Sequence, residues 1–95
     1  MKLRYKLPGG RKRLLRDWIA ALRSGEYKQC RNMYESGYKT FCAVGLLNYI
    51  SGSSHASSSS ATTFLNVERT AVIYWNDEAM YDFNKIANNL EILYG

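Results

Sequence analysis

The chain has 95 residues, enough to bury one hydrophobic core and too few for two domains. Hydrophobic residues make up 46% of it and aromatic residues 14%, the composition of a folded protein, and its two cysteines are too few for a disulfide framework. The net charge of +5 arises from residues 1–16, which carry seven cations and no acid, so the basicity is local and indicates an anionic partner at that end.

Residues 1–7 alternate between cationic and apolar side chains, with Lys2, Arg4 and Lys6 on one side. A period of two residues is typical of a half-buried strand, here with a cationic outer face. Pro8-Gly9-Gly10 is expected to end this strand, because proline fixes φ and glycine permits a sharp turn.

Residues 11–24 change to a helical period, and Gly25 supplies the stop signal. The apolar stripe of this predicted helix consists of Leu14, Leu15, Trp18, Ile19 and Leu22. We expect Trp18 to belong to the core. Elsewhere on the helix Lys12, Arg16 and Arg23 have no acidic neighbours.

Residues 27–41 are rich in tyrosine and contain the turn signal Glu35-Ser36-Gly37. Aromatic residues favour strands, and a Ser-Gly pair between two such runs marks a turn. The sequence therefore predicts a short β-hairpin in this region.

Residues 41–50, FCAVGLLNYI, form the most apolar stretch of the chain. In a helix these side chains leave almost no polar face, so the helix has to be enclosed by other elements. Asn48 is its polar member and is expected to bond to backbone, because an unsatisfied buried amide costs about 1 to 3 kcal/mol. Ser51-Gly52 closes the helix.

The segment that follows is harder to assign. Residues 51–63 are mainly serine and threonine and are predicted to form a flexible surface loop, because they contain little that would offset the cost of ordering the backbone. Residues 64–75 fit either a helix or a strand, and we favour a helix that runs towards Ile73. Residues 76–78 are predicted to form a turn.

The last predicted element is a helix that begins after Asp82, a residue suited to cap it. Its apolar stripe consists of Phe83, Ile86, Ala87, Leu90 and Leu93. The predicted fold is thus a small, mostly helical α+β domain of residues 1–95, in which a central buried helix is accompanied by an N-terminal strand and a short hairpin.

Several segments together resemble a known pattern. They are residues 18–29 (WIAALRSGEYKQ), 41–47 (FCAVGLL), 73–77 (IYWND) and 82–91 (DFNKIANNLE). In this order they are similar to the ALRSG, CCLGVL, LND and SFxxIA segments of a family of small proteins found largely in bacteriophages and in bacteria that carry prophages. Ala43 stands where that family has the second of two cysteines, which weakens any expectation that paired cysteines bind a metal.

The resemblance implies a phage accessory protein that acts in the host cytoplasm, and it carries no reaction over to this chain. Small phage proteins without a catalytic signature are often counter-defence factors that sequester a signalling nucleotide or block a host protein. The longest apolar run, residues 41–47, is too short to cross a bilayer, so no membrane contact is expected.

The basic N-terminal face is the candidate binding site, because cations and free helix amides both attract phosphate. Its expected ligand-binding residues are Arg4, Lys6, Arg11, Lys12, Arg13 and Arg16. The expected ligand is a nucleotide or a short nucleic acid, and a homo-oligomer would enclose it better than one small domain. A merely solvated basic surface would have the same composition.

Two other readings remain open. Tyrosines 34, 38 and 74 would form an aromatic surface if the protein is instead an inhibitor that occludes a host protein. A hydrolase is the third reading, but His55 lies among serines without a scaffold that would orient a catalytic base. Cys30, Cys42 and His55 match no zinc spacing, so we expect no catalytic residue, no metal and no cofactor.

Overall fold

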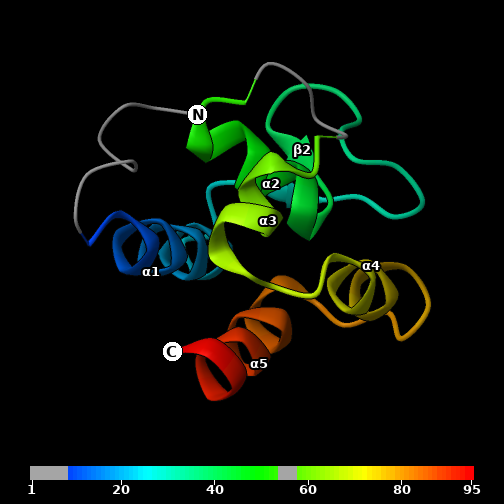
Figure 1. Ribbon diagram of the computed structural model, residues 1–95. Coiled ribbons are helices and arrows are strands. Elements are labelled where there is room, and N and C mark those ends of the chain that lie inside the picture. Colours follow the sequence, from blue (N-terminus) through cyan, green and yellow to red (C-terminus); the bar gives the residue numbers. More distant parts are fainter. Residues whose placement is uncertain (1–8, 54–57) are drawn as a thin grey trace.

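The computed structural model describes residues 9–53 and 58–95 (Figure 1). The elements in chain order are α1 (Gly10–Arg23), β1 (Lys28–Gln29), β2 (Thr40–Phe41), α2 (Ala43–Ser51), α3 (Ser60–Leu65), α4 (Arg69–Asp77) and α5 (Phe83–Tyr94). The mostly helical α+β class is confirmed. The N-terminal strand predicted for residues 1–7 lies outside the described residues.

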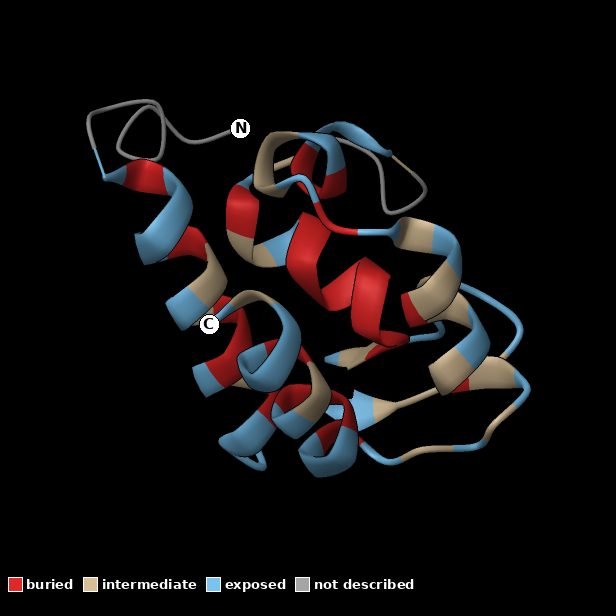
Figure 2. Cartoon of the chain, turned by 60° about the horizontal axis from the view of Figure 1, so that its bottom comes forward, coloured by how far each residue is buried: buried red, intermediate tan, exposed pale blue. Residues whose placement is uncertain are grey.

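Helix α2 is the centre of the molecule, as its sequence predicts. Residues 41–48 are all buried, and Figure 2 shows α2 enclosed by the other elements. Helices α1, α3 and α4 pack against it, and α5 packs against α1 and α4. Its ends are defined by Cys42, whose sulfur accepts a hydrogen bond from the Gly45 amide at 3.4 Å, and by Gly52 in the left-handed conformation (φ 80°).

Trp18 joins α1 to this centre. Its side chain is completely buried, and its indole Nε1 donates a hydrogen bond to the carbonyl oxygen of Ala43 at 2.9 Å. Leu14, Ile19 and Leu22 are buried beside it, which confirms the apolar stripe, whereas Leu15 is only half-buried. Leu15 therefore keeps part of its apolar surface in contact with solvent.

The predicted β-hairpin is wrong in its pairing. Strand β1 pairs with β2 in parallel, with Lys28 opposite Thr40 and Gln29 opposite Phe41. The turn forms later than predicted, at residues 38–39, where the Thr40 amide donates to the Gly37 carbonyl oxygen. Glu35, which was predicted to lie in the turn, instead makes an antiparallel bridge to Phe41. Residues 30–39 therefore act as a crossover loop, and propensity could not reveal this because strand direction depends on non-local partners.

The predicted serine-rich loop of residues 51–63 is also too long. Ser51 is the buried last residue of α2, and residues 60–63 begin helix α3. Ala61 and Thr62 are buried because α3 packs against α2, so tertiary contact stabilises a short helix that its composition does not favour. Asn48 bonds to backbone as expected, since its Nδ2 donates to the carbonyl oxygen of Ser58 at 2.8 Å.

Residues 64–75 are helical rather than extended, which confirms the favoured alternative. The helix is interrupted, however, because Asn66 adopts the left-handed conformation (φ 57°) between α3 and α4. The turn predicted at residues 76–78 is wrong in part, since α4 continues through Asp77. Helix α5 begins as predicted, with the Asp82 carboxylate accepting a hydrogen bond from the Lys85 amide at 2.8 Å.

Candidate functional site

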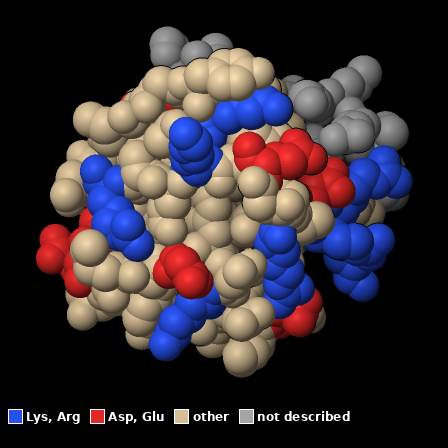
Figure 3. All heavy atoms as spheres, turned by 180° about the vertical axis from the view of Figure 1, so that it is seen from behind, with Lys and Arg blue, Asp and Glu red and all other residues tan. Residues whose placement is uncertain are grey.

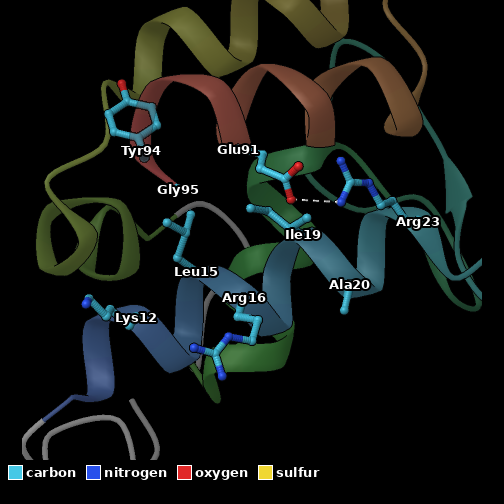
Figure 4. Close-up of a pocket in the computed structure, with 9 residues that line it drawn as sticks. All are labelled: Lys12, Leu15, Arg16, Ile19, Ala20, Arg23, Glu91, Tyr94 and Gly95. Atoms are coloured by element: carbon cyan, nitrogen blue, oxygen red, sulfur yellow. Dashed lines mark hydrogen bonds and ion pairs between the residues drawn. The ribbon is translucent and has the colours of Figure 1, made fainter.

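A groove of about 590 Å³ runs between α1 and α5 (Figure 4). Its lining residues in the described part of the chain are Lys12, Leu15, Arg16, Ile19, Ala20, Arg23, Glu91, Tyr94 and Gly95. Small-molecule sites in proteins typically have volumes of about 300 to 1,000 Å³ and mainly apolar walls with a few polar groups. The groove has the dimensions of such a site.

The floor of the groove is apolar. Leu15 and Ile19 point from α1 toward α5 in Figure 4, and Tyr94 stands at the end of α5. The hydroxyl of Tyr94 accepts a hydrogen bond from the Glu68 amide at 3.2 Å, which fixes that ring. A ligand with a flat or apolar portion would therefore remove apolar surface from water on entering the groove.

The rim of the groove on α1 is cationic. Lys12, Arg16 and Arg23 share one side of the helix, because separations of 4 and 11 residues correspond to about one and about three helical turns. Lys12 and Arg16 are exposed and extend from the α1 edge. Their spacing places two positive charges within reach of a single anionic group.

The opposite end of the groove is held by an ion pair between the two helices. Arg23 donates from Nη1 to Glu91 Oε2 at 3.1 Å and from Nη2 to Asn88 Oδ1 at 2.7 Å. Glu91 is the one acidic residue among the described residues that line the groove. The charge of Arg23 is therefore paired by Glu91, and Lys12 and Arg16 are the other two cations of the lining.

The structure brings together only some of the expected ligand-binding residues. Lys12 and Arg16 line the groove, and Arg4 and Lys6 lie outside the described residues. The guanidinium of Arg11 instead lies 6.0 Å from the centre of the Phe64 ring, and Arg13 is exposed away from the groove. Two residues along a helix correspond to about 200° of rotation, so Arg11 and Arg13 point to different sides.

Figure 3 shows the distribution of charge on one face of the molecule. Several Lys and Arg side chains gather at one edge, next to acidic side chains, and the other cations on this face are also spread among acidic and uncharged residues. The cations on this face therefore do not form one continuous basic surface.

Among the groove residues with polar side chains, three were not predicted from the sequence: Arg23, Glu91 and Tyr94. Arg23 carried a signal, because its helical spacing to Lys12 and Arg16 was visible. Glu91 and Tyr94 carried none, since they lie in α5 and reach the groove only through the packing of α5 on α1. Non-local contacts of this kind leave no local pattern.

The tyrosines of the alternative aromatic surface have different environments. Tyr38 is 86% and Tyr74 is 58% exposed, but Tyr34 is half-buried beneath Arg69, whose guanidinium lies 5.2 Å from the ring centre. The aromatic cluster that does form consists of Tyr27, Phe41 and Tyr49, with ring centres 5.0 to 6.1 Å apart.

The described residues contain no cluster of three or more His, Cys, Asp or Glu side chains that could hold a metal ion. Within the same residues, no helix is long and apolar enough to span a bilayer. Two aspartates among these residues make hydrogen bonds to backbone amides: Asp77 accepts from the Asn32 amide at 3.0 Å, and Asp82 accepts from the Lys85 amide at 2.8 Å and caps α5.

The thiols of Cys30 and Cys42 are free; Cys42 is buried and Cys30 is half-buried. Burial raises the pKa of Cys42, and burial followed by the charge of Asp77 raises the pKa of Cys30. A raised pKa keeps a thiol protonated and unreactive near neutral pH.

A pH-dependent stability follows for Cys42. Because the folded protein holds the thiol proton more tightly than the unfolded chain, the associated stability is present below the unfolded pKa of about 9 and is lost as pH rises through the higher folded pKa. We expect the unfolding free energy of the wild type, relative to Cys42→Ser, to fall as pH rises above about 9. Urea titrations of both proteins measure this difference, and a constant difference would contradict the prediction.

Comparison with known proteins gives a family but no relative of known activity. Residues 11–58 match the family described as "Domain of unknown function (DUF8296)", and the chain belongs to this family. No curated protein and no solved structure matches the chain. The matched region contains α1, both strands and α2, and therefore the α1 wall of the groove, whereas α5 lies beyond it.

Proposed function

We propose that this protein is a non-enzymatic binding protein for an anionic small molecule, and that the groove between α1 and α5 is its binding site. The observation that carries the proposal is the pair of cations Lys12 and Arg16 on the rim of a groove with an apolar floor. Cations bind phosphate or carboxylate, and the floor accommodates the uncharged remainder of the ligand.

A nucleotide fits these requirements better than a long nucleic acid. It combines one anionic end with a flat, partly apolar base, and its size suits a groove of about 590 Å³. A duplex or long single strand would need an extended basic track, but Arg11 and Arg13 diverge from the rim formed by Lys12 and Arg16.

The biological role proposed here follows the resemblance to phage and prophage proteins. A small protein that sequesters a signalling nucleotide in the host cytoplasm would act as a counter-defence factor without catalysing a reaction. The alternative role is occlusion of a host protein through exposed aromatic side chains, for which Tyr38 and Tyr74 are available.

The proposal is tested by titrating the protein with 5′-mononucleotides and cyclic nucleotides and measuring binding by calorimetry. Lys12→Ala/Arg16→Ala is expected to weaken binding at least about tenfold, because hydrogen bonds to charged groups contribute about 1.5 to 3 kcal/mol. Affinity should also fall as salt is added, since exposed charges are screened.

Two matched variants separate the groove from general basicity. Arg11→Ala/Arg13→Ala removes the same charge from the same helix and is expected to cost less affinity, through long-range electrostatics alone. Lys28→Ala/Lys39→Ala removes the same charge from exposed positions remote from the groove lining and should leave binding unchanged. Equal losses in all three would assign binding to net charge, and no binding of any nucleotide would favour the protein-partner alternative.

A further inference from the structure

The groove has a chemical direction, which bears on the kind of nucleotide it would take. Lys12 and Arg16 lie at one end, and Arg23 with Glu91 lies at the other. Arg16 and Arg23 are seven residues apart on α1, which corresponds to about 10 Å along the helix axis. That span is comparable to the length of an extended nucleoside monophosphate.

Glu91 determines which end of a ligand can lie beside it. A phosphate at this end would be repelled by the carboxylate, whereas at the other end Lys12 and Arg16 would attract it. The Glu91 end therefore suits an uncharged group that donates hydrogen bonds. An ionised carboxylate has about four acceptor positions. Arg23 donates to Oε2 of Glu91, so acceptor positions of this carboxylate remain for a ligand.

The pair of Arg23 and Glu91 also presents a donor beside an acceptor. Arg23 is held on the groove side by Glu91 and Asn88, so its guanidinium has a defined position from which further N–H groups can donate. A base that matches this pair needs an acceptor next to one or two donors on the same edge.

Guanine has that edge. Its O6 accepts, and its N1–H and N2–H₂ donate side by side. Adenine offers N6–H₂ beside the acceptor N1, cytosine offers one donor beside two acceptors, and uracil offers a single N–H between two carbonyls. Only guanine among the four can accept from Arg23 and place two donors on the Glu91 carboxylate.

We infer that the groove selects guanine nucleotides, with the phosphate at Lys12 and Arg16 and the base edge at Arg23 and Glu91. The inference rests on the proposed function, since it names the ligand of the same site. In this orientation the base and sugar lie over the apolar side chains of Leu15 and Ile19.

The test is a calorimetric titration with GMP, IMP, AMP and guanosine. We expect GMP to bind most tightly, IMP more weakly because it lacks the N2 amino group, and AMP at least tenfold more weakly than GMP, since a site that hydrogen-bonds its ligand rejects an analogue that leaves its groups unpaired. Guanosine should bind more weakly than GMP because it lacks the phosphate.

Glu91→Gln tests the base-reading role directly. The amide keeps the size of the side chain but replaces one acceptor oxygen with a donor, so the preference for GMP over AMP should fall about tenfold or more. Glu78→Gln changes an exposed carboxylate outside the groove lining and should leave the preference unchanged. Melting temperatures of both variants show whether each remains folded.

The outcomes separate this inference from the proposed function. Equal affinity for all mononucleotides, with loss on Lys12→Ala/Arg16→Ala, would overturn guanine selection and leave anion binding in place. Guanosine binding as tightly as GMP would overturn the assigned orientation. Absence of binding for all four compounds would overturn both proposals.

Discussion

The Gly45→Ala variant is expected to lose about 3 kcal/mol of unfolding free energy or more, at the upper end of the range for overpacked cores. A Cβ at this position would lie 1.9 Å from the carbonyl oxygen of Tyr34 and 2.8 Å from its carbonyl carbon. Contacts under about 3 Å do not occur between such atoms, so either the helix or the Tyr34 backbone would have to move.

Neither movement is easy. The Tyr34 carbonyl oxygen accepts a hydrogen bond from the Cys42 amide at 3.0 Å, directly before the first turn of α2. The Tyr34 side chain is held separately by Arg69, which donates to its hydroxyl. Helix α2 is enclosed by α1, α3 and α4, so it has no free direction in which to shift.

The direction of the expected change in unfolding free energy distinguishes Gly45 from a glycine in an exposed helix. In an exposed helix interior, replacement of glycine by alanine stabilises by about 0.5 to 1 kcal/mol because it restricts the unfolded chain. Gly25→Ala is a useful comparison, since nothing lies within 4 Å of its Cβ and only its φ of 77° opposes the change. We expect Gly25→Ala to cost about 1 to 2 kcal/mol, the penalty of the left-handed conformation.

Urea unfolding followed by tryptophan fluorescence measures both variants, with Trp18 as a buried probe. A Gly45→Ala protein as stable as the wild type would mean that the Tyr34 carbonyl does not lie against α2. Thermal unfolding by circular dichroism provides a second measurement if the variant is only partly folded at room temperature.

The periodicity of apolar residues was sufficient to predict the main helices. Helices α1, α2 and α5 each carry a stripe or run of apolar side chains with local stop or cap signals, such as Gly52 and Asp82, and all three form where expected. These signals are local, so a single sequence contains them.

Features that depend on non-local partners were not predictable. The parallel direction of β1 and β2 depends on a crossover loop, and helix α3 depends on its contact with α2. Gly45 could be recognised as a weak helix former, but nothing in the sequence indicated that the Tyr34 carbonyl approaches it. The same limit applies to the site: cations on α1 were visible, and the α5 wall with Glu91 was not.

Asn76 is another residue whose role depends on partners that are distant in sequence. Its side chain is 1% exposed and takes part in four hydrogen bonds. Oδ1 accepts from Gln29 Nε2 at 2.9 Å and from the Ala43 amide at 3.1 Å. Nδ2 donates to the Cys30 carbonyl oxygen at 2.9 Å and to Asp77 Oδ1 at 2.8 Å.

These bonds complete the parallel strand pair. The Cys30 amide donates to the Phe41 carbonyl oxygen at 2.9 Å, and in a regular ladder the next bond would run from the Ala43 amide to the Cys30 carbonyl. The Asn76 amide bonds to both of these groups and takes the place of that ladder bond. It thereby ties the end of α4 to the start of α2.

Asn76→Asp is expected to destabilise the protein by about 3 kcal/mol or more at neutral pH, because each buried polar group left without a partner costs about 1 to 3 kcal/mol. An ionised carboxylate keeps the acceptor bonds to Gln29 and Ala43 but cannot donate to Cys30 or Asp77. It would also add a buried negative charge beside the Asp77 carboxylate. Asn84→Asp is the control, because Asn84 is exposed in the first turn of α5, where a negative charge is neutral or slightly stabilising.

The pH dependence identifies the cause of the destabilisation. Burial and the neighbouring Asp77 would raise the folded-state pKa of an aspartate at position 76, so the variant should be most stable, relative to wild type, below the unfolded pKa of about 4. Its stability should then fall as pH rises through the folded-state value, because the ionised form has no proton to donate to the Cys30 carbonyl. Urea titrations of both proteins between about pH 4 and 8 measure this trend. A difference that does not change with pH would show that lost packing, rather than the lost donor, explains the effect.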